Sequence, residues 1–303
     1  MGCDDPDVRR LSLLILAALI AALSASLLPV AAAGATMSET SAPTRTPVDP
    51  STRHFLLLGD SLSWQAMPYA RQVVAATGAR FDWLAYPGAS ICDVVRPVDA
   101  LAARERPDVS VVEFFGTAFS RCSQRLHPYS EAWFRLYAID AAKIATTLLA
   151  ARPSGAVYFV DGPVVPSLPA RLQGYAHRVR QIYEQVATAL DRRHPGQVAY
   201  LDAASAVEGP GGRYVQSLPC LSVERRRHLC QGRTVRRIHG IRYIEVRARI
   251  GGHFCAVIAP SGVIVPPGCT PYSSGAYRFG AAMMAPGIAR ERLSPRPIYR
   301  NQR

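Results

Sequence analysis

The sequence is almost without lysine: of its 35 Lys and Arg residues, only Lys143 is a lysine. Against 22 acidic residues this leaves a formal net charge of +13, nearly all of it carried by arginine. Guanidinium groups bind phosphates and carboxylates in a bidentate manner, so contact with an anionic envelope polymer is one interpretation. A bias toward arginine along a whole chain is also typical of a GC-rich genome, and this second explanation is the simpler one.

Several functional patterns are missing. No pair of cysteines or histidines has the C-x-x-C or H-x-x-H spacing of a zinc site, so we expect no metal and no other cofactor. No motif for nucleic-acid binding accompanies the positive charge, which excludes nucleic acid as an expected partner. The chain has no internal repeat, and we expect it to be a monomer.

The amino terminus has the pattern of an export signal. Arg9 and Arg10 precede an apolar run from Leu11 to Val30, and small residues follow up to Ala35. This order of a basic, an apolar and a small-residue region predicts a signal peptide over residues 1–35. The alternative is an uncleaved membrane anchor, since about 20 apolar residues can span a bilayer. In either case the remainder is secreted or associated with the cell envelope.

Residues 36–53 are rich in Ser, Thr and Pro and lack apolar periodicity, which predicts a flexible linker before a folded domain over 54–295. After the leader the chain has six cysteines, and an even number in an exported protein predicts disulfides. Six cysteines allow 15 connectivities. Proximity in sequence favours the pairs Cys92–Cys122, Cys220–Cys230 and Cys255–Cys269.

Strand-like apolar runs alternate with helix-like segments along the domain. This order predicts an α/β fold, a three-layer α/β/α sandwich around a parallel sheet of about five strands. Between Gly209 and Gly252 the pattern is lost, and we expect a long loop region with one strand-like piece, Tyr243–Val246. The expected strands are 55–58, 81–85, 109–115, 156–160 and 197–201. The expected helices are 64–77, 92–105, 130–151, 168–193 and 272–285, the last ended by Pro286.

The most informative stretch is His54–Ser63, in which an apolar run leads directly into Gly-Asp-Ser. Ser61 is expected where a buried strand ends and a helix begins, and open α/β sheets bind their ligands at such points. A serine at that place can act as a nucleophile, with free backbone N–H groups to hold an oxyanion. Taken alone, the same residues are also consistent with a simple helix N-cap.

Gly59-Asp60-Ser61-Leu62 resembles the first sequence block of the SGNH/GDSL hydrolases, which are esterases and lipases of flavodoxin-like fold. The likeness extends from about Phe55 to Ile288 and is greatest to an exported, disulfide-containing branch of actinobacterial type. It implies that Gly88 supplies the second block, an oxyanion donor, and that His253 supplies the histidine of the last block. Two positions depart from the family pattern, since Thr117 replaces the Asn of the third block and Ile250 replaces the Asp three residues before the histidine.

The resemblance implies an exported serine esterase or lipase-like hydrolase that acts on acyl esters of lipids or glycans. Ser61 is then the nucleophile and His253 its base, with Ser61, Gly88 and Thr117 as the oxyanion hole. Glu245 is the nearest acidic residue in sequence that could orient His253, and activity is expected to fall below about pH 6.5 as imidazole protonates. Two alternatives remain: an envelope-binding protein that keeps the fold without the chemistry, and an acyltransferase that uses the same two side chains.

Overall fold

The computed structural model describes residues 49–163, 170–230, 236–248, 253–254 and 273–294. The predicted leader, most of the linker, Ile250 and the Cys255–Cys269 pair lie outside these residues. Among the described helices, none combines the length and the apolar content needed to cross a bilayer. Near the start of the described chain, Arg53 forms ion pairs with Asp108 (3.2 Å) and Glu291 (3.1 Å), which attach the end of the predicted linker to the domain.

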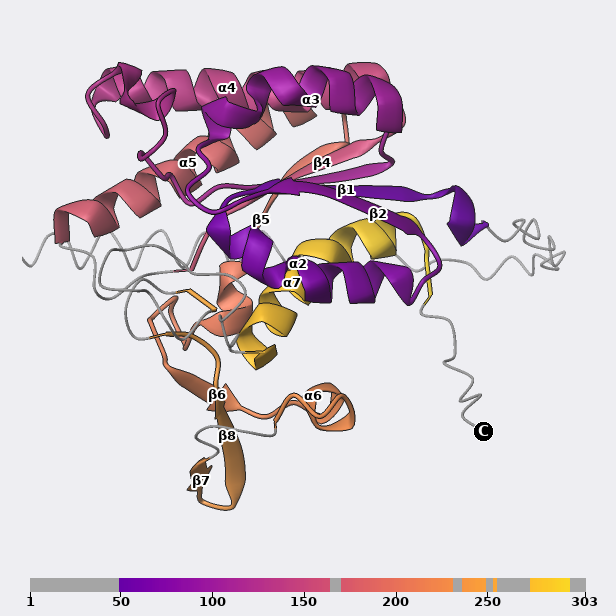
Figure 1. Ribbon diagram of the computed structural model, residues 1–303, viewed down its shortest axis with the longest axis vertical. Helices are drawn as coiled ribbons and strands as arrows, with labels where there is room; N and C mark the ends of the chain where they lie inside the picture. The colour runs from indigo at the N-terminus through magenta and orange to yellow at the C-terminus, as the bar shows by residue number, and fades with distance from the viewer. Residues whose placement is uncertain (1–48, 164–169, 231–235, 249–252, 255–272, 295–303) are drawn as a thin grey trace, which may run out of the picture. The chain divides into compact units, whose positions relative to one another are not determined.

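A parallel sheet lies at the centre of the domain, between two layers of helices (Figure 1). It has five strands, in the order β2-β1-β3-β4-β5. This confirms the expected α/β architecture. The order reverses between β1 and β3, and this switch point is where ligands bind in sheets of this type. The strands are β1 (His54–Gly59), β2 (Arg80–Ala85), β3 (Val109–Glu113), β4 (Ala156–Val160) and β5 (Val198–Leu201).

Helices cover both faces of the sheet (Figure 1). Leu56 and Leu58 face the core under three of the helices, whereas Phe55 and Leu57 face the core under the other two. All four side chains are fully buried, which explains why β1 is a continuous apolar run without alternation. One face is covered by α3 (Ile91–Glu105), α4 (Glu131–Ala151) and α5 (Ala170–Asp191), and the other by α2 (Ser61–Ala75) and α7 (Ser273–Arg290).

Pro286 does not end the last helix, contrary to the sequence prediction. It lies inside α7, which continues to Arg290. A proline inside a helix removes one hydrogen bond and tends to kink the helix. The buried side chains of Met283 and Met284 and the close packing of Gly287 on Val109 hold the turns on both sides of Pro286 against the sheet. Packing therefore outweighs the local preference.

The strand-like piece expected at Tyr243–Val246 is confirmed by β8, but the loop expected around it was wrong. The described residues of Gly209–Gly252 form a second, antiparallel sheet in the order β6-β8-β7. We call it, together with α6, the small lobe. Cys220, Cys230, Ile244 and Val246 form its own buried cluster. Its elements are β6 (Ser217–Pro219), α6 (Ser222–Arg226), β7 (Arg236–Ile238) and β8 (Ile241–Glu245). Outside the small lobe, the described residues also form the 3₁₀ turns η1 (Pro50–Thr52), η2 (Ser123–Arg125) and η3 (Ala204–Val207).

Candidate active site

Ser61 is the first residue of α2 and follows β1 directly. Its Oγ lies 3.1 Å from Nε2 of His253, within hydrogen-bond distance, although 192 positions separate the two residues. Ser61 is 9% exposed and His253 is half-buried. The structure therefore brings together the two side chains that the sequence singled out as nucleophile and base.

Gly59 makes this turn from strand to helix possible. A Cβ atom at Gly59 would lie 2.7 Å from the carbonyl oxygen of Glu113 and 2.3 Å from Oγ of Ser63. Contacts this short do not occur for real side chains, so no other residue fits without displacing the backbone of β3. The absence of a side chain thus sets how closely the ends of β1 and β3 approach each other.

The first turn of α2 has N–H groups without acceptors inside the helix. The N–H of Leu62 donates to Oδ1 of Asp60 (2.9 Å), and the N–H of Ser63 donates to Oε2 of Glu113 (3.1 Å). Among the described residues, no acceptor is found for the N–H of Ser61. Gly88 has φ +78°, which favours glycine, and a Cβ atom there would meet nothing within 4 Å.

Two buried carboxyl groups, those of Asp60 and Glu113, lie beneath the nucleophile. Burial raises the pKa of Asp60 to about 6, although hydrogen bonds from Phe115, Leu62 and Thr117 act in the opposite direction. Burial and the neighbouring charge of Asp60 raise the pKa of Glu113 well above its ordinary value. Oε1 of Glu113 has no hydrogen-bond partner in the described part of the chain, which further disfavours the ionised form.

Thr117 contacts Asp60. Its hydroxyl donates to Oδ2 of Asp60 over 3.4 Å, and the N–H of Phe115 donates to the same oxygen at 2.8 Å. The carbonyl oxygen of Thr117 accepts a hydrogen bond from Oγ of Ser90, which connects the loop after β3 with the loop after β2. In this arrangement the single hydroxyl proton of Thr117 is directed at a buried carboxylate.

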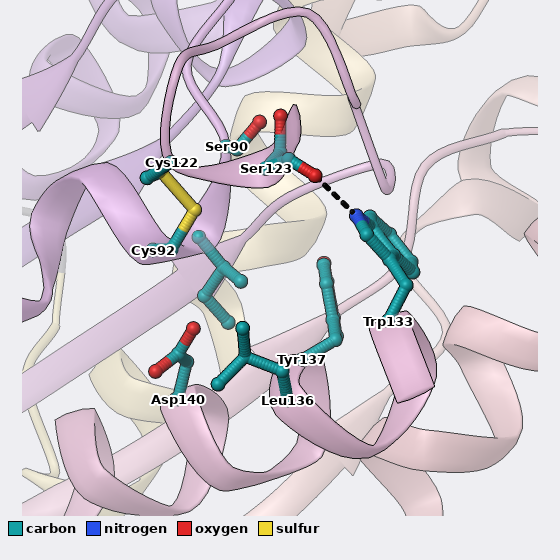
Figure 2. A pocket seen from close by; sticks show the side chains of 9 residues that line it. Ser90, Cys92, Cys122, Ser123, Trp133, Leu136, Tyr137 and Asp140 are labelled. Carbon is teal, nitrogen blue, oxygen red and sulfur yellow. Dashed lines mark hydrogen bonds between the residues drawn. A yellow bond between two sulfur atoms is a disulfide. The ribbon is translucent and has the colours of Figure 1, made fainter. Parts of the chain in front are cut away.

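A disulfide joins the start of α3 to the loop after β3. Cys92 and Cys122 are bonded, as the sequence proximity predicted, and so are Cys220 and Cys230 in the small lobe. Figure 2 shows the first bridge above side chains of α4, where Nε1 of Trp133 donates to the carbonyl oxygen of Ser123 (3.1 Å). The space enclosed there is about 10 Å³, the room of one water molecule, so it is a packed support rather than a substrate site.

Gln65 is a site residue that sequence reasoning missed. It lies on α2, one helical turn after Ser61, and is 5% exposed. Its Oε1 accepts a hydrogen bond from the N–H of Phe254 (2.7 Å), the residue that follows His253. Phe254 is itself fully buried against Phe279, with ring centroids 5.4 Å apart. The helix that carries the nucleophile therefore also anchors the backbone beside the histidine.

The carbonyl oxygen of His253 accepts a hydrogen bond from the N–H of Ala248 (2.9 Å). The carbonyl oxygen of Ala248 in turn accepts one from the Tyr214 hydroxyl (3.2 Å). Glu245, the acidic residue considered as an orienting group, accepts a hydrogen bond from Nε2 of Gln216 (2.9 Å). The described contacts thus show the backbone at His253 fixed on both sides.

A cluster of possible metal ligands lies elsewhere, at the amino-terminal end of β1. Donor atoms of His54, Asp82 and Glu105 all lie within 4.8 Å of one another. The His54 ring is engaged at both nitrogens, by the carbonyl oxygen of Glu105 (3.0 Å) and by Asp82 (2.8 Å). The described contacts therefore account for this cluster as a hydrogen-bonded group that ties β1 to β2 and α3.

No protein-family model matches the chain, and no curated protein matches it. Solved structures do match, and several of them are described as GDSL-like lipases or as lipolytic proteins of the G-D-S-L family. The chain is similar to a GDSL-like lipase from Bacteroides thetaiotaomicron, with 7% identity over 53% of this chain and 73% of that one (TM-score 0.41).

The inhibitor-bound aryl esterase of M. smegmatis shares 13% identity over 54% of this chain and 91% of its own (TM-score 0.40). A carbohydrate esterase family 2 enzyme with a carbohydrate binding domain, from Corynascus thermopiles, shares 11% identity over 81% of this chain and 68% of its own (TM-score 0.47). Identities this low leave the chemistry of this chain to be argued from its own residues.

Proposed function

We propose that the protein is an exported serine hydrolase of the SGNH/GDSL type that cleaves acyl esters of lipids or glycans. The observation that carries the proposal is the 3.1 Å contact between Oγ of Ser61 and Nε2 of His253 at the switch point of the sheet. A nucleophile within hydrogen-bond distance of a base is the arrangement that hydroxyl-based acyl chemistry requires.

In the proposed first step, Oγ of Ser61 forms a bond to the acyl carbonyl carbon while His253 accepts the hydroxyl proton. The carbonyl oxygen becomes an oxyanion, held by the N–H groups of Ser61 and Gly88. His253 then gives its proton to the leaving alcohol, and an acyl-serine ester remains. Water, deprotonated by His253, releases the acid and restores Ser61.

The amino terminus of α2 favours this chemistry, because unsatisfied N–H groups and the helix dipole stabilise negative charge. The Ser61 N–H is available for this purpose, since the next two N–H groups of the helix are bonded to Asp60 and Glu113. The two disulfides support a site of action in an oxidising compartment outside the cytoplasm.

A fluorophosphonate probe with p-nitrophenyl acetate as substrate tests the proposal. We expect the wild-type protein to be labelled at Ser61 and to hydrolyse the ester, and we expect Ser61→Ala to lose both properties. Ser222→Ala is a matched control, because Ser222 is an exposed serine that also begins a helix. Full turnover by Ser61→Ala, or no labelling of folded wild-type protein, would contradict the proposal and favour an envelope-binding role.

Acyl transfer to another acceptor uses the same Ser61 and His253. Product analysis with added alcohols or sugars separates the two reactions. We expect free acid as the main product, whereas a new ester as the main product would assign the protein as an acyltransferase.

A further inference from the structure

The small lobe contains a cavity of about 480 Å³ whose lining includes three arginines. Each comes from a different element: Arg225 from α6, Arg237 from β7 and Arg242 from β8 (Figure 1). Gly240 and Ile241, from the turn and the start of β8, complete the wall between them. None of these residues takes part in the contacts described above for Ser61 and His253.

Two of these arginines are direct cross-strand partners. Arg237 is paired with Arg242 in the antiparallel register of β7 and β8, so both side chains extend from the same face of the hairpin. Like charges directly opposite each other destabilise a strand pair. Both side chains are exposed, so solvent weakens this repulsion, and an anion between the two guanidinium groups would remove it.

The chain itself supplies no such anion among its described residues. From Arg225 to Ile244 the sequence contains no Asp or Glu, and the described part of the chain shows no ion pair for Arg225, Arg237 or Arg242. The carboxylates that flank this stretch are engaged elsewhere. Glu224 accepts from Arg278 at 2.6 and 2.7 Å, and Glu245 accepts from Gln216 at 2.9 Å.

We propose that this cavity binds a phosphate ester, such as the phosphate of a glycerol phosphate or of a sugar phosphate. A tetrahedral phosphate can accept hydrogen bonds from several guanidinium groups at once, whereas one guanidinium fork satisfies a planar carboxylate. Arg225 is held at the cavity wall, since its Nη1 donates to the carbonyl oxygen of Cys220 (2.9 Å). Within the described ranges its other guanidinium N–H groups have no acceptor.

The hollow is open to solvent, since Arg225, Arg237 and Arg242 are all exposed, and it has room for an organic phosphate as well as for a free ion. Sites for small organic ligands measure about 300–1,000 Å³, and 480 Å³ falls within this range. The side chain of Ile241 is 51% exposed and offers an apolar surface beside the arginines. A glycerol or sugar moiety would rest on this surface while its phosphate contacts Arg237 and Arg242.

Isothermal titration of the full chain with glycerol 1-phosphate tests this site. We expect saturable binding with one ligand per chain, weakened on the order of 100-fold in Arg237→Gln/Arg242→Gln, since each charge-assisted hydrogen bond lost costs about tenfold. The matched control is Arg226→Gln/Arg236→Gln, which removes the same charge from exposed arginines of α6 and β7 outside the cavity lining. We expect this control to bind like the wild type.

Equal weakening in both double variants would show non-specific attraction to a basic surface and would overturn the proposal, as would the lack of saturable binding by the wild type. Vesicles of phosphatidylcholine with and without phosphatidylglycerol identify the source of the phosphate. Binding to the anionic vesicles that depends on Arg237 and Arg242 would assign a lipid headgroup, and its absence would assign a soluble ester. Turnover of p-nitrophenyl acetate by both double variants is expected to equal that of the wild type, so this site and the Ser61–His253 chemistry are tested separately.

Discussion

The two halves of the candidate site are held in different ways. On the nucleophile side, Ser61 follows a fully buried strand, and the carboxyl groups of Asp60 and Glu113 fix the helix that it begins. On the histidine side, the N–H of Ala248 donates to the carbonyl oxygen of His253, and the N–H of Phe254 donates to the side chain of Gln65. The first side is held by the core and by two buried carboxyl groups, and the second side by backbone hydrogen bonds and by the buried ring of Phe254.

The largest expected loss of activity comes from removing His253, and it shows whether Ser61 and His253 act as one unit. We expect His253→Ala to lower kcat on the order of 10³-fold or more, and the double variant with Ser61→Ala to be no slower than either single variant. The reason is that neither side chain performs the chemistry without the other. Steady-state hydrolysis of p-nitrophenyl acetate measures this, with His127→Ala, an exposed histidine, as the control. Additive losses would show that the two residues act independently.

Substitution of Gln65 removes one hydrogen bond that holds the backbone next to His253. Gln65→Met keeps the size of the side chain and removes the acceptor for the Phe254 N–H, so we expect kcat to fall about 10- to 100-fold with little change in KM. Gln65→Glu retains an acceptor oxygen and should recover most of the rate. Melting temperatures show whether both variants are folded. An unchanged kcat in folded Gln65→Met would mean that Gln65 does not position His253.

The buried carboxyl groups of Asp60 and Glu113 should make the free energy of unfolding depend on pH. Because burial raises the pKa of Asp60 and Glu113, the folded state keeps protons that the unfolded chain has already released. The free energy of unfolding should therefore fall as the pH rises from the ordinary Asp value of 3.8 through about 6. We expect Glu113→Gln to flatten this dependence in urea unfolding, whereas Glu184→Gln, an exposed control, should leave it as it is. Equal slopes in all three proteins would contradict the raised pKa values.

The smallest effect concerns Thr117. Its hydroxyl donates to Asp60 over 3.4 Å, so we expect Thr117→Val to change kcat by less than about threefold, although loss of an oxyanion donor costs about 10²–10³. A loss of that size on p-nitrophenyl acetate would place the Thr117 hydroxyl in the oxyanion hole, as the resemblance implied.

The sequence predicted most of the structure on the nucleophile side. The apolar run before Gly59 and the alternation of strands with helices gave the sheet, because buried parallel strands leave a clear pattern. The three-residue strands β6 and β7 are too short to show any periodicity, so the small lobe was predicted as loop. The predicted helix end at Pro286 was wrong for a different reason. Packing of the neighbouring Gly287 on Val109 outweighs the cost of a proline inside a helix.

Gln65 is the clearest example of a site residue that the sequence alone does not reveal. A glutamine in a helix is typical of an exposed position, and nothing in its neighbours indicates a buried acceptor. The only available signal is its spacing of four residues from Ser61, which places both on one face of the helix. This spacing identifies Gln65 as a site residue only once the fold shows that its partner is the N–H of Phe254.

The position of Gln65 one turn after Ser61 has a mechanical result. When α2 tilts or shifts as a rigid rod, the serine and the attachment point of the histidine segment travel together. The hydrogen bond from the Phe254 N–H to Gln65 therefore couples the position of the imidazole to that of the hydroxyl. The Asp60 and Glu113 carboxyl groups stabilise the turn that carries the hydroxyl, because they hold the N–H groups of Leu62 and Ser63.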